Sequence, residues 1–495
     1  MPGKPDVGGD AADRSGISAN RRTFMGTVGA ITGASALGGT ALADDGDEKT
    51  EVGGEGSRTD GDARNAILVI PDGAAQAHIS GARYLKAYRE DSEEFPLNVT
   101  PGGTTLHVDQ AEQIGGMSTY PDNPDRTPIT DSAAAGTKTY SGAIGGVGSE
   151  DEYTPVKTIL EAAHEAGMAT GLVTTTRITH ATPAAFATHV PDRGVEDEIA
   201  RQYVDDGNVD VLLGGGKRHF DPEERDDGED MLARAEEQGY QIAETEAELA
   251  DADSGKLLGL FGSESDRSAH MSYYVDREYV DDTDEPGLVE MTEKAIDILS
   301  DCENGFFLMV ESGRVDHQGH ANDNAITHEQ LECDEVFGTV LDYAEDDATS
   351  ETFAMQVADH ETGGMSLGWD AYDMDWGAID DIRASLEHLE SAIDETGDDR
   401  GATVDVVEEH TGFELTEGEI IDITGGDLAK VLNKRTQMGW SSDSHTAEEV
   451  PSYASGPNAE FFGRYFDNTE VAVGIAEALG LEFEPGREID YEFRD

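Results

Sequence analysis

Acidic and histidine side chains are concentrated in the run from Glu311 to His320, Glu-Ser-Gly-Arg-Val-Asp-His-Gln-Gly-His. Asp316 and His320 are four residues apart in this run, so a helical turn would place both on one face. Carboxylate oxygens and imidazole nitrogens are ligands that zinc takes in proteins. The run therefore predicts a metal site, although its composition would also fit a solvated polar loop.

The elements that would position such ligands are short buried strands. Three apolar stretches each run directly into acidic residues: 66–71 into Asp72, 306–310 into Glu311, and 352–358 into Asp359 and His360. In open α/β sheets, ligands bind at the carboxyl ends of the strands. Because carboxylates are seldom buried unless they are paired or bound to a metal, three such strand ends favour a cation site.

Helix and strand patterns alternate between these segments. Amphipathic stretches at 156–166 and 195–204 precede apolar ones at 169–174 and 209–213, and further helices are expected at 286–300 and 324–343. This alternation predicts an α/β fold with a doubly wound, mostly parallel central sheet and helices on both faces.

The stretch 366–438 breaks the alternation. It is helical in places, as at 379–393 and 427–432, rich in Gly and Asp elsewhere, and without a convincing buried strand. We expect an insertion over the carboxyl edge of the sheet, where it could cap a site or form a dimer contact.

Two further segments carry residues that could do chemistry. Ser132 lies at the start of an alanine-rich helix, where unpaired N–H groups attract an anion. A plain helix cap is the alternative, but a metal beside its oxygen would make this serine a nucleophile toward phosphorus. His445 follows the insertion in a polar segment, and a histidine in such a loop usually has no special role.

The chain is strongly acidic, with 106 acidic and 33 basic residues and a net charge of -73. The acids are spread along the chain, in stretches such as 221–230 and 244–253. Such a surface would repel nucleic acid, so no nucleic-acid binding is expected. The composition resembles that of proteins from extreme halophiles, chiefly haloarchaea, whose acidic coat stays hydrated where salt screens its self-repulsion. We therefore expect the fold to need molar salt.

The first 43 residues have the pattern of an export signal. Arg21 and Arg22 precede a Gly-, Ala- and Thr-rich stretch that ends in small residues at Ala43, as in twin-arginine signal peptides. Residues 44–64 are acidic and Gly-rich and are typical of a disordered spacer. After removal of a signal peptide at 1–43 no membrane span is expected, and the protein would be extracellular or attached to the cell surface.

The chain has two cysteines, Cys302 and Cys333. An exported protein could pair them, but spacing alone does not place them within bonding distance. Both a disulfide and two buried free thiols stay open at this point.

Short segments of the chain, taken in order over about residues 65–465, resemble those of alkaline phosphatases: 70–73, 130–134, 180–183, 189–193, 310–320, 357–364 and 445–446. The resemblance implies a large central sheet between helices in a domain at 65–495, with a crown-like insertion at about 366–438. It implies hydrolysis of phosphate monoesters to alcohol and inorganic phosphate with an alkaline optimum. Phosphate scavenging outside the cell is the use that we expect. A homodimer is frequent in the family.

The family site holds two zinc ions and one magnesium ion, and the resemblance assigns ligands by position. The ligands implied are Asp316, His320 and His445 for one zinc ion, Asp72, Asp359 and His360 for the other, and Asp72, Thr182 and Glu311 for magnesium. Ser132 would be the nucleophile, forming a phosphoserine intermediate that hydroxide then hydrolyses. Arg193 would bind the non-bridging phosphate oxygens as a bidentate fork.

Two positions depart from the best-known bacterial pattern, which has aspartate and lysine where this chain has His180 and His317; animal members also have histidines there. Imidazole suits zinc or manganese at least as well as magnesium, so Mn²⁺ or Zn²⁺ could replace Mg²⁺ at the third site. Both histidines are candidates for that site or its surroundings.

Two other functions stay open as alternatives. A phosphodiesterase or phosphonate hydrolase of the same zinc superfamily could share the two-zinc ligands, but Arg193 and the Thr182 and Glu311 site favour monoesters. An exported protein that binds metal or phosphate without turnover would also fit the acidic composition.

Overall fold

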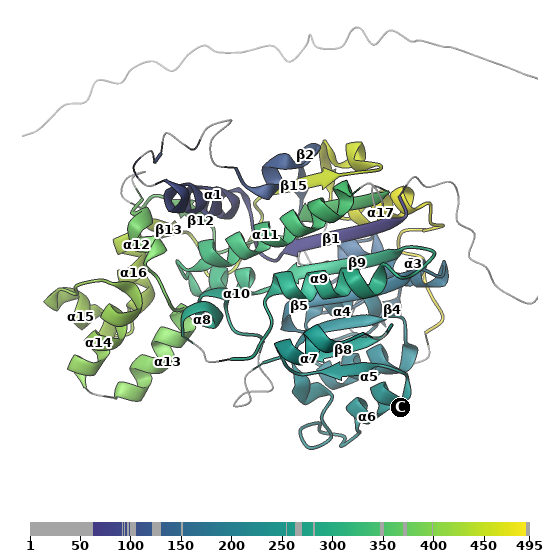
Figure 1. The fold of residues 1–495 in the computed structure, drawn as a ribbon, viewed down its shortest axis with the longest axis horizontal. Helices are drawn as coiled ribbons and strands as arrows, with labels where there is room; N and C mark the ends of the chain where they lie inside the picture. The colour runs from purple at the N-terminus through teal and green to yellow at the C-terminus, as the bar shows by residue number, and fades with distance from the viewer. Residues whose placement is uncertain are drawn as a thin grey trace, which may run out of the picture. The chain divides into compact units, whose positions relative to one another are not determined.

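A ten-stranded sheet forms the centre of the protein (Figure 1), with the strand order β16-β2-β15-β10-β1-β9-β5-β6-β8-β7. Every strand of this sheet except β15 runs in the same direction. The strands are β1 (Asn65–Pro71), β2 (Gln113–Ser118), β5 (Ala169–Arg177), β6 (Val211–Gly215), β7 (Gln241–Ala243), β8 (Leu257–Leu260), β9 (Phe306–Ser312), β10 (Thr352–Val357), β15 (Val450–Ser455) and β16 (Tyr465–Asp467). The predicted α/β fold with a mostly parallel sheet is confirmed.

The computed structural model describes residues 63–491 except for short segments at 92, 94, 97–98, 100–104, 121–129, 150–151, 254, 263–269, 281–282, 347–350, 370–373 and 398. The predicted signal peptide and nearly all of the predicted spacer therefore lie outside the described residues.

Helices cover both faces of the sheet. The helices outside the region between β12 and β13 are α1 (Gln76–Glu90), α2 (Thr130–Ala135), α3 (Ile159–Glu165), α4 (Ala181–Ala187), α5 (Glu196–Asp206), α6 (Met231–Glu237), α7 (Glu246–Asp251), α8 (Tyr274–Tyr279), α9 (Leu288–Leu299), α10 (Arg314–Ala321), α11 (Ile326–Glu345) and α17 (Glu470–Leu479). Helices α9 and α11 pack together in front of the sheet in Figure 1, and α3 and α4 pack against β5 and β9 from the other side.

The three central strands explain why their sequences read as continuous apolar runs. Every residue of β1, β9 and β10 is buried, because each strand has a neighbour on both sides and helices above and below. Their apolar side chains belong to the main hydrophobic core of the protein. Burial on both faces therefore leaves only the strand ends available for polar side chains.

Between β12 (Met365–Leu367) and β13 (Met438–Trp440) the chain forms a helical region. Its helices are α12 (Trp376–Asp380), α13 (Leu386–Thr396), α14 (Arg400–Thr411), α15 (Glu417–Thr424) and α16 (Leu428–Thr436). The two short strands pair antiparallel, so this segment leaves and returns at one place. Apolar side chains of α13, α14, α15 and α16 form a separate hydrophobic cluster, which gives the region its own small core.

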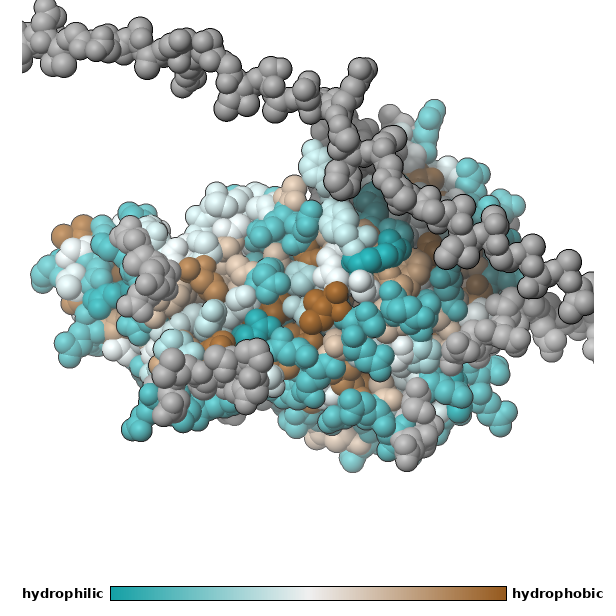
Figure 2. All heavy atoms as spheres, turned by 90° about the horizontal axis from the view of Figure 1, so that it is seen from above, coloured by the Kyte–Doolittle hydropathy of each residue, from teal (hydrophilic) through white to brown (hydrophobic). Residues whose placement is uncertain are grey.

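The surface matches the acidic composition. Figure 2 shows hydrophilic residues over most of one face, with small hydrophobic groups between them. Among the described residues, no helix combines the length and the apolar character needed to cross a bilayer. Both cysteines are free; Cys333 is buried, whereas Cys302 is only partly buried.

A buried glutamate on α11 should make stability depend on pH. Glu329 accepts a hydrogen bond from the backbone N–H of Tyr274 at 2.8 Å, but its Oε1 has no hydrogen-bond partner among the described residues. Burial, and then the charge of Glu332, raise the pKa of Glu329 from 4.5 to about 7. Because the pKa of this acid is raised in the folded protein, its contribution is complete below pH 4.5 and is lost as the pH rises through 7.

We expect the free energy of unfolding of Glu329→Gln, relative to that of the wild type, to increase from pH 5 to pH 8 by on the order of 1–3 kcal/mol. The amide oxygen can still accept from Tyr274, while the buried charge is gone. Thermal unfolding at both pH values measures this difference. Glu332→Gln is the matched control: it breaks a pair with the buried Arg277, whose two distances are 2.6 and 2.7 Å, and should destabilise at both pH values. A pH-independent effect of Glu329→Gln would contradict the prediction.

Candidate active site

The carboxyl ends of three adjacent strands bring the predicted acids together. Strand β1 lies between β9 and β10, and Ile70 of β1 is in register with Glu311 of β9. Asp72 follows β1, and Asp359 with His360 follows β10. The neighbouring strands therefore place these side chains at one edge of the sheet, as predicted from the three apolar stretches.

Helix α10 begins directly after β9 and carries Asp316 and His320 on adjacent turns. The Nε2 atom of His320 lies 3.4 Å from Oδ2 of Asp316. The other ring nitrogen, Nδ1, donates to the carbonyl oxygen of Asp443 at 2.7 Å, so Nε2 is the nitrogen that a metal would bind after displacing its proton. Gly73 permits this approach: its φ is +77°, and a Cβ there would lie 2.9 Å from the Cα of Asp316.

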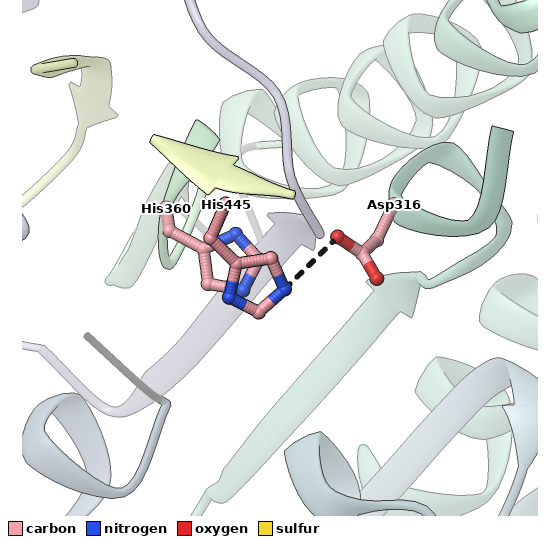
Figure 3. A group of neighbouring side chains, drawn as sticks. All are labelled: Asp316, His360 and His445. Atoms are coloured by element: carbon pink, nitrogen blue, oxygen red, sulfur yellow. Dashed lines mark ion pairs between the residues drawn. The ribbon is translucent and has the colours of Figure 1, made fainter. Parts of the chain in front are cut away.

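A small sheet delivers His445 to the same place. Strand β14 (His445–Thr446) pairs antiparallel with β11 (Glu361–Thr362), directly after His360. The rings of His445 and His360 stack with centroids 3.7 Å apart. Nε2 of His445 lies 3.6 Å from Oδ1 of Asp316, and Figure 3 shows both rings beside this carboxylate. The polar segment after the insertion therefore joins the site through strand pairing.

The site contains two groups of possible metal ligands. Within each group, the ligand atoms lie within 4.8 Å of one another. One group is Asp72, Asp359 and His360, as the family resemblance implies. The other is Asp316, His360 and His445, which contains His360 where the resemblance implies His320. The stacking of His360 on His445 brings the ring of His360 within reach of both groups, while Nε2 of His320 still lies 3.4 Å from Asp316 of the second group.

A third set surrounds Glu311. Its Oε2 accepts hydrogen bonds from the hydroxyls of Thr174 and Thr176 at 2.5 and 3.2 Å. Asp72 and Thr182 also interact with the Glu311 side chain. The trio predicted for magnesium, Asp72, Thr182 and Glu311, therefore lies together and offers only oxygen atoms.

The electrostatics of the site fit bound cations. Oδ1 of Asp72 and Oε1 of Glu311 are buried and have no hydrogen-bond partner among the described residues. Burial, followed by the charges of Asp359 and Asp316, raises the pKa of Asp72 well above its usual value. Packed carboxylates of this kind are costly unless a cation compensates them, and carboxylate oxygen with imidazole nitrogen is a donor set that suits zinc.

The histidines of the site divide into two electrostatic classes. A hydrogen bond to Asp316 raises the pKa of His320 to about 9. Burial, followed by the charge of His360, lowers the pKa of His445 to about 4. Burial and the charge of Arg314 lower the pKa of His317 to about 3. His317 and His445 are therefore neutral at neutral pH, as a metal ligand must be.

A cavity of about 390 Å³ opens over these groups. Its lining includes every predicted site residue except Ser132 and Glu311: Asp72, His180, Thr182, Arg193, Asp316, His317, His320, Asp359, His360 and His445. Arg193 Nη2 donates to Nε2 of His180 at 2.8 Å. A guanidinium and several carboxylates therefore line one open cavity.

Ser132 stands apart from the described cavity lining. It is buried on α2, and α2 packs against α4, the helix that carries Thr182. The preceding segment 121–129 lies outside the described residues. The role of Ser132 as nucleophile stays a prediction.

Several residues at the site were not singled out from the sequence. Thr362 donates to Oδ1 of Asp316 at 2.5 Å, and Arg314 Nη1 donates to Nδ1 of His317 at 2.7 Å. His270 lies with its ring centroid 4.3 Å from that of His317. Thr362 and Arg314 fall within the predicted metal-binding segments, so their positions in the sequence could have indicated a place at the site. No sequence feature indicated His270.

Among the described residues, one other group has metal-like spacing: His107, Asp334 and Glu335. Asp334 accepts from the backbone N–H groups of His107 and Val108 at 2.9 and 3.1 Å, and Lys86 Nζ lies 3.4 Å from Glu335. These contacts explain the cluster as a cap with an ion pair, since the ammonium already supplies the positive charge.

Comparison with known families decides the broad identity of this site. The family model described as alkaline phosphatase matches residues 63–481. The chain belongs to the alkaline phosphatase family. It is 33% identical to alkaline phosphatase 3 of Bacillus subtilis over 84% of this chain and 89% of that protein.

Solved alkaline phosphatases share the fold. The Thermus thermophilus alkaline phosphatase aligns with a TM-score of 0.74 and 30% identity, covering 87% of this chain and 94% of that one. A TAB5 alkaline phosphatase variant with one histidine replaced by aspartate, described with Mg bound in the M3 site, aligns with a TM-score of 0.59 and 26% identity over 85% and 99% of the two chains. The chain described in Figure 1 is therefore a phosphoric monoester hydrolase of a metal-dependent family.

Proposed function

We propose that phosphate monoesters are hydrolysed in the cavity over the β1, β9 and β10 strand ends, with Ser132 as nucleophile and through a phosphoserine intermediate. One observation carries the proposal. Two groups of carboxylate and histidine ligands, with His360 in both, line the same cavity as Arg193. Bound cations would lower the pKa of a hydroxyl and stabilise charge on the phosphoryl oxygens. This donor set supports the assignment of two zinc ions and one magnesium ion.

The side chains would act on the phosphoryl group in distinct ways. Arg193 would hold two non-bridging oxygens, and its contact with His180 limits the orientation of the guanidinium. Ser132 Oγ would form a bond to phosphorus as the alcohol leaves, and water would then release phosphate and restore the serine. A dianionic monoester presents the oxygens that such a site requires, whereas a diester presents fewer.

For the third cation we propose magnesium. Asp72, Thr182 and Glu311 offer only oxygen atoms, which magnesium prefers. The TAB5 relative is described with Mg in its M3 site after a histidine was replaced by aspartate, which fits a preference of magnesium for oxygen atoms. Manganese or zinc are the alternatives if His180 or His317 contributes a nitrogen. Metal analysis of the purified protein measures the zinc and magnesium content, and a protein without magnesium would reject this assignment.

Hydrolysis of p-nitrophenyl phosphate against bis-p-nitrophenyl phosphate tests the substrate class. With zinc and magnesium in high salt, we expect kcat/KM for the monoester to exceed that for the diester by at least about 10³-fold, because Arg193 and the cations require a dianionic group. A preference for the diester would favour the phosphodiesterase alternative. Absence of hydrolysis of both would favour a binding protein.

We also propose export by the twin-arginine route, followed by action outside the cell or at its surface. The support is Arg21 and Arg22 ahead of the Gly- and Ala-rich stretch. Replacing both arginines with lysine should block export, so that phosphatase activity is found inside the cell and not in the medium. Wild-type amounts of that variant in the medium would reject the route.

A homodimer that needs molar salt is our proposal for the working form. The family resemblance supports the dimer, and the charge of -73 supports the salt requirement. Sedimentation and activity should be measured together in molar and in dilute salt. A fully active monomer in dilute buffer would reject both parts.

A further inference from the structure

A buried arginine connects the helical region between β12 and β13 with the candidate active site. Arg314 is the first residue of α10, and its side chain is only 7% exposed. Its Nη1 donates to Nδ1 of His317 at 2.7 Å, and its Nη2 donates to Oε2 of Glu387 on α13 at 3.2 Å. The guanidinium also lies over the ring of Tyr273, 3.6 Å from the centroid. Arg314 therefore contacts a cavity-lining residue on one side and α13 on the other.

The start of α13 is held in place by two buried carboxylates. Asp276 of α8 accepts from the backbone N–H and the hydroxyl of Ser385 at 2.7 and 2.6 Å. Asp323, just after α10, accepts from the N–H of Leu386 at 2.8 Å. Glu387 is the next residue, and it also accepts from the hydroxyl of Tyr273 at 3.1 Å. Its position is therefore defined although its side chain is 70% exposed.

The contact with Arg314 determines which nitrogen of His317 carries the hydrogen. An arginine N–H can only donate, so Nδ1 of His317 must accept, and the hydrogen of the neutral ring lies on Nε2. His180 follows the same rule, because Arg193 donates to its Nε2. The rings of His180 and His317 both line the cavity, with centroids 5.7 Å apart. Each neutral ring then carries its hydrogen on the nitrogen that the arginine does not contact, which is Nε2 in His317 and the buried Nδ1 in His180.

We infer that Glu387 is a positioning residue for substrate binding: through Arg314 it holds His317 as an N–H donor toward the phosphoryl group or its bound water. The inference rests on the proposed function, since it assumes that the cavity binds phosphate monoesters. The helical region between β12 and β13 thereby contributes to affinity at the site without lining the cavity. While Arg314 donates to Nδ1, the neutral ring of His317 has no lone pair for the third cation, so this contact argues against the manganese or zinc alternative at His317.

Steady-state kinetics of the metal-loaded enzyme test the role of Glu387. We expect Glu387→Ala to raise KM for p-nitrophenyl phosphate and the inhibition constant of inorganic phosphate about three- to tenfold, with kcat changed by less than about twofold. Glu387→Gln should have a smaller effect, because the amide oxygen can still accept from Arg314. Glu390→Ala is the matched control, since it removes a carboxylate from the same helix and Glu390 is not among the described partners of Arg314. An unchanged KM in Glu387→Ala, or an equal change in Glu390→Ala, would overturn the inference.

Nitrogen-15 NMR of histidine-labelled, metal-loaded protein gives a second readout. Comparison with His317→Gln assigns the His317 signals. We expect a protonated Nε2 and an acceptor Nδ1 in the wild type, and a mixture of tautomers in Arg314→Met. A protonated Nδ1 in the wild type would overturn the inference even if Arg314→Met failed to fold. These results are separable from the proposed function: turnover retained by Ser132→Ala rejects the nucleophile, whereas an unchanged KM in Glu387→Ala rejects only the positioning role.

Discussion

Ser132→Ala should lower kcat for phosphate monoesters by roughly 10³-fold or more, because the variant has no oxygen with which to form the phosphoserine intermediate. Affinity for inorganic phosphate should stay within about tenfold of the wild type, since Arg193 and the metal ligands are unchanged. Turnover is measured with p-nitrophenyl phosphate and phosphate affinity by calorimetry, both in high salt with zinc and magnesium.

A matched control separates loss of the nucleophile from general damage. Ser452→Ala also removes a buried serine hydroxyl, on β15, and that hydroxyl has no hydrogen-bond partner among the described residues. We expect its kcat to equal that of the wild type. In addition, brief incubation with labelled phosphate monoester at low pH should label the wild type but not Ser132→Ala. Near-normal turnover in Ser132→Ala would remove Ser132 from the mechanism.

Chelation of divalent cations should abolish activity and lower the unfolding temperature. The reason is the set of buried carboxylates that the cations compensate, above all Asp72 and Glu311. A cation at 1,000 times its Kd stabilises the folded protein by about 4 kcal/mol. Zinc and magnesium together should restore both activity and unfolding temperature, and neither alone should restore both fully.

The loss on chelation should also depend on pH. Burial raises the pKa of Glu311 from 4.5 to about 7 when no cation is bound. Because this pKa is raised in the folded protein, the stripped protein keeps the contribution of Glu311 below pH 4.5 and loses it as the pH rises through 7. Stripped and loaded protein should therefore differ more in unfolding temperature at pH 8 than at pH 5. Equal unfolding temperatures at pH 8 would contradict a structural role for the cations.

The sheet and its chemical edge could be predicted from local sequence. The runs 66–71, 306–310 and 352–358 are apolar enough to require burial on both faces, and each ends in an acid, so a parallel sheet with carboxylates at one edge follows. The Asp316 and His320 spacing likewise belongs to a single helix, α10. These features depend on residues that are close in the chain. Periodicity and composition are therefore sufficient to predict them.

The tertiary structure decided the contacts between distant segments. His445 reaches His360 only because β14 pairs with β11, and the resulting stack brings His360 into both ligand groups. Arg314 lies within the run from Glu311 to His320, yet its partner Glu387 lies 73 residues further on. Such contacts depend on strand order, on the path of the chain between β12 and β13, and on side-chain packing, and none of these is encoded in the spacing of residues along one segment. The sequence by itself therefore determined which chemistry the edge of the sheet supports, and only the folded chain determined which side chains share each part of it.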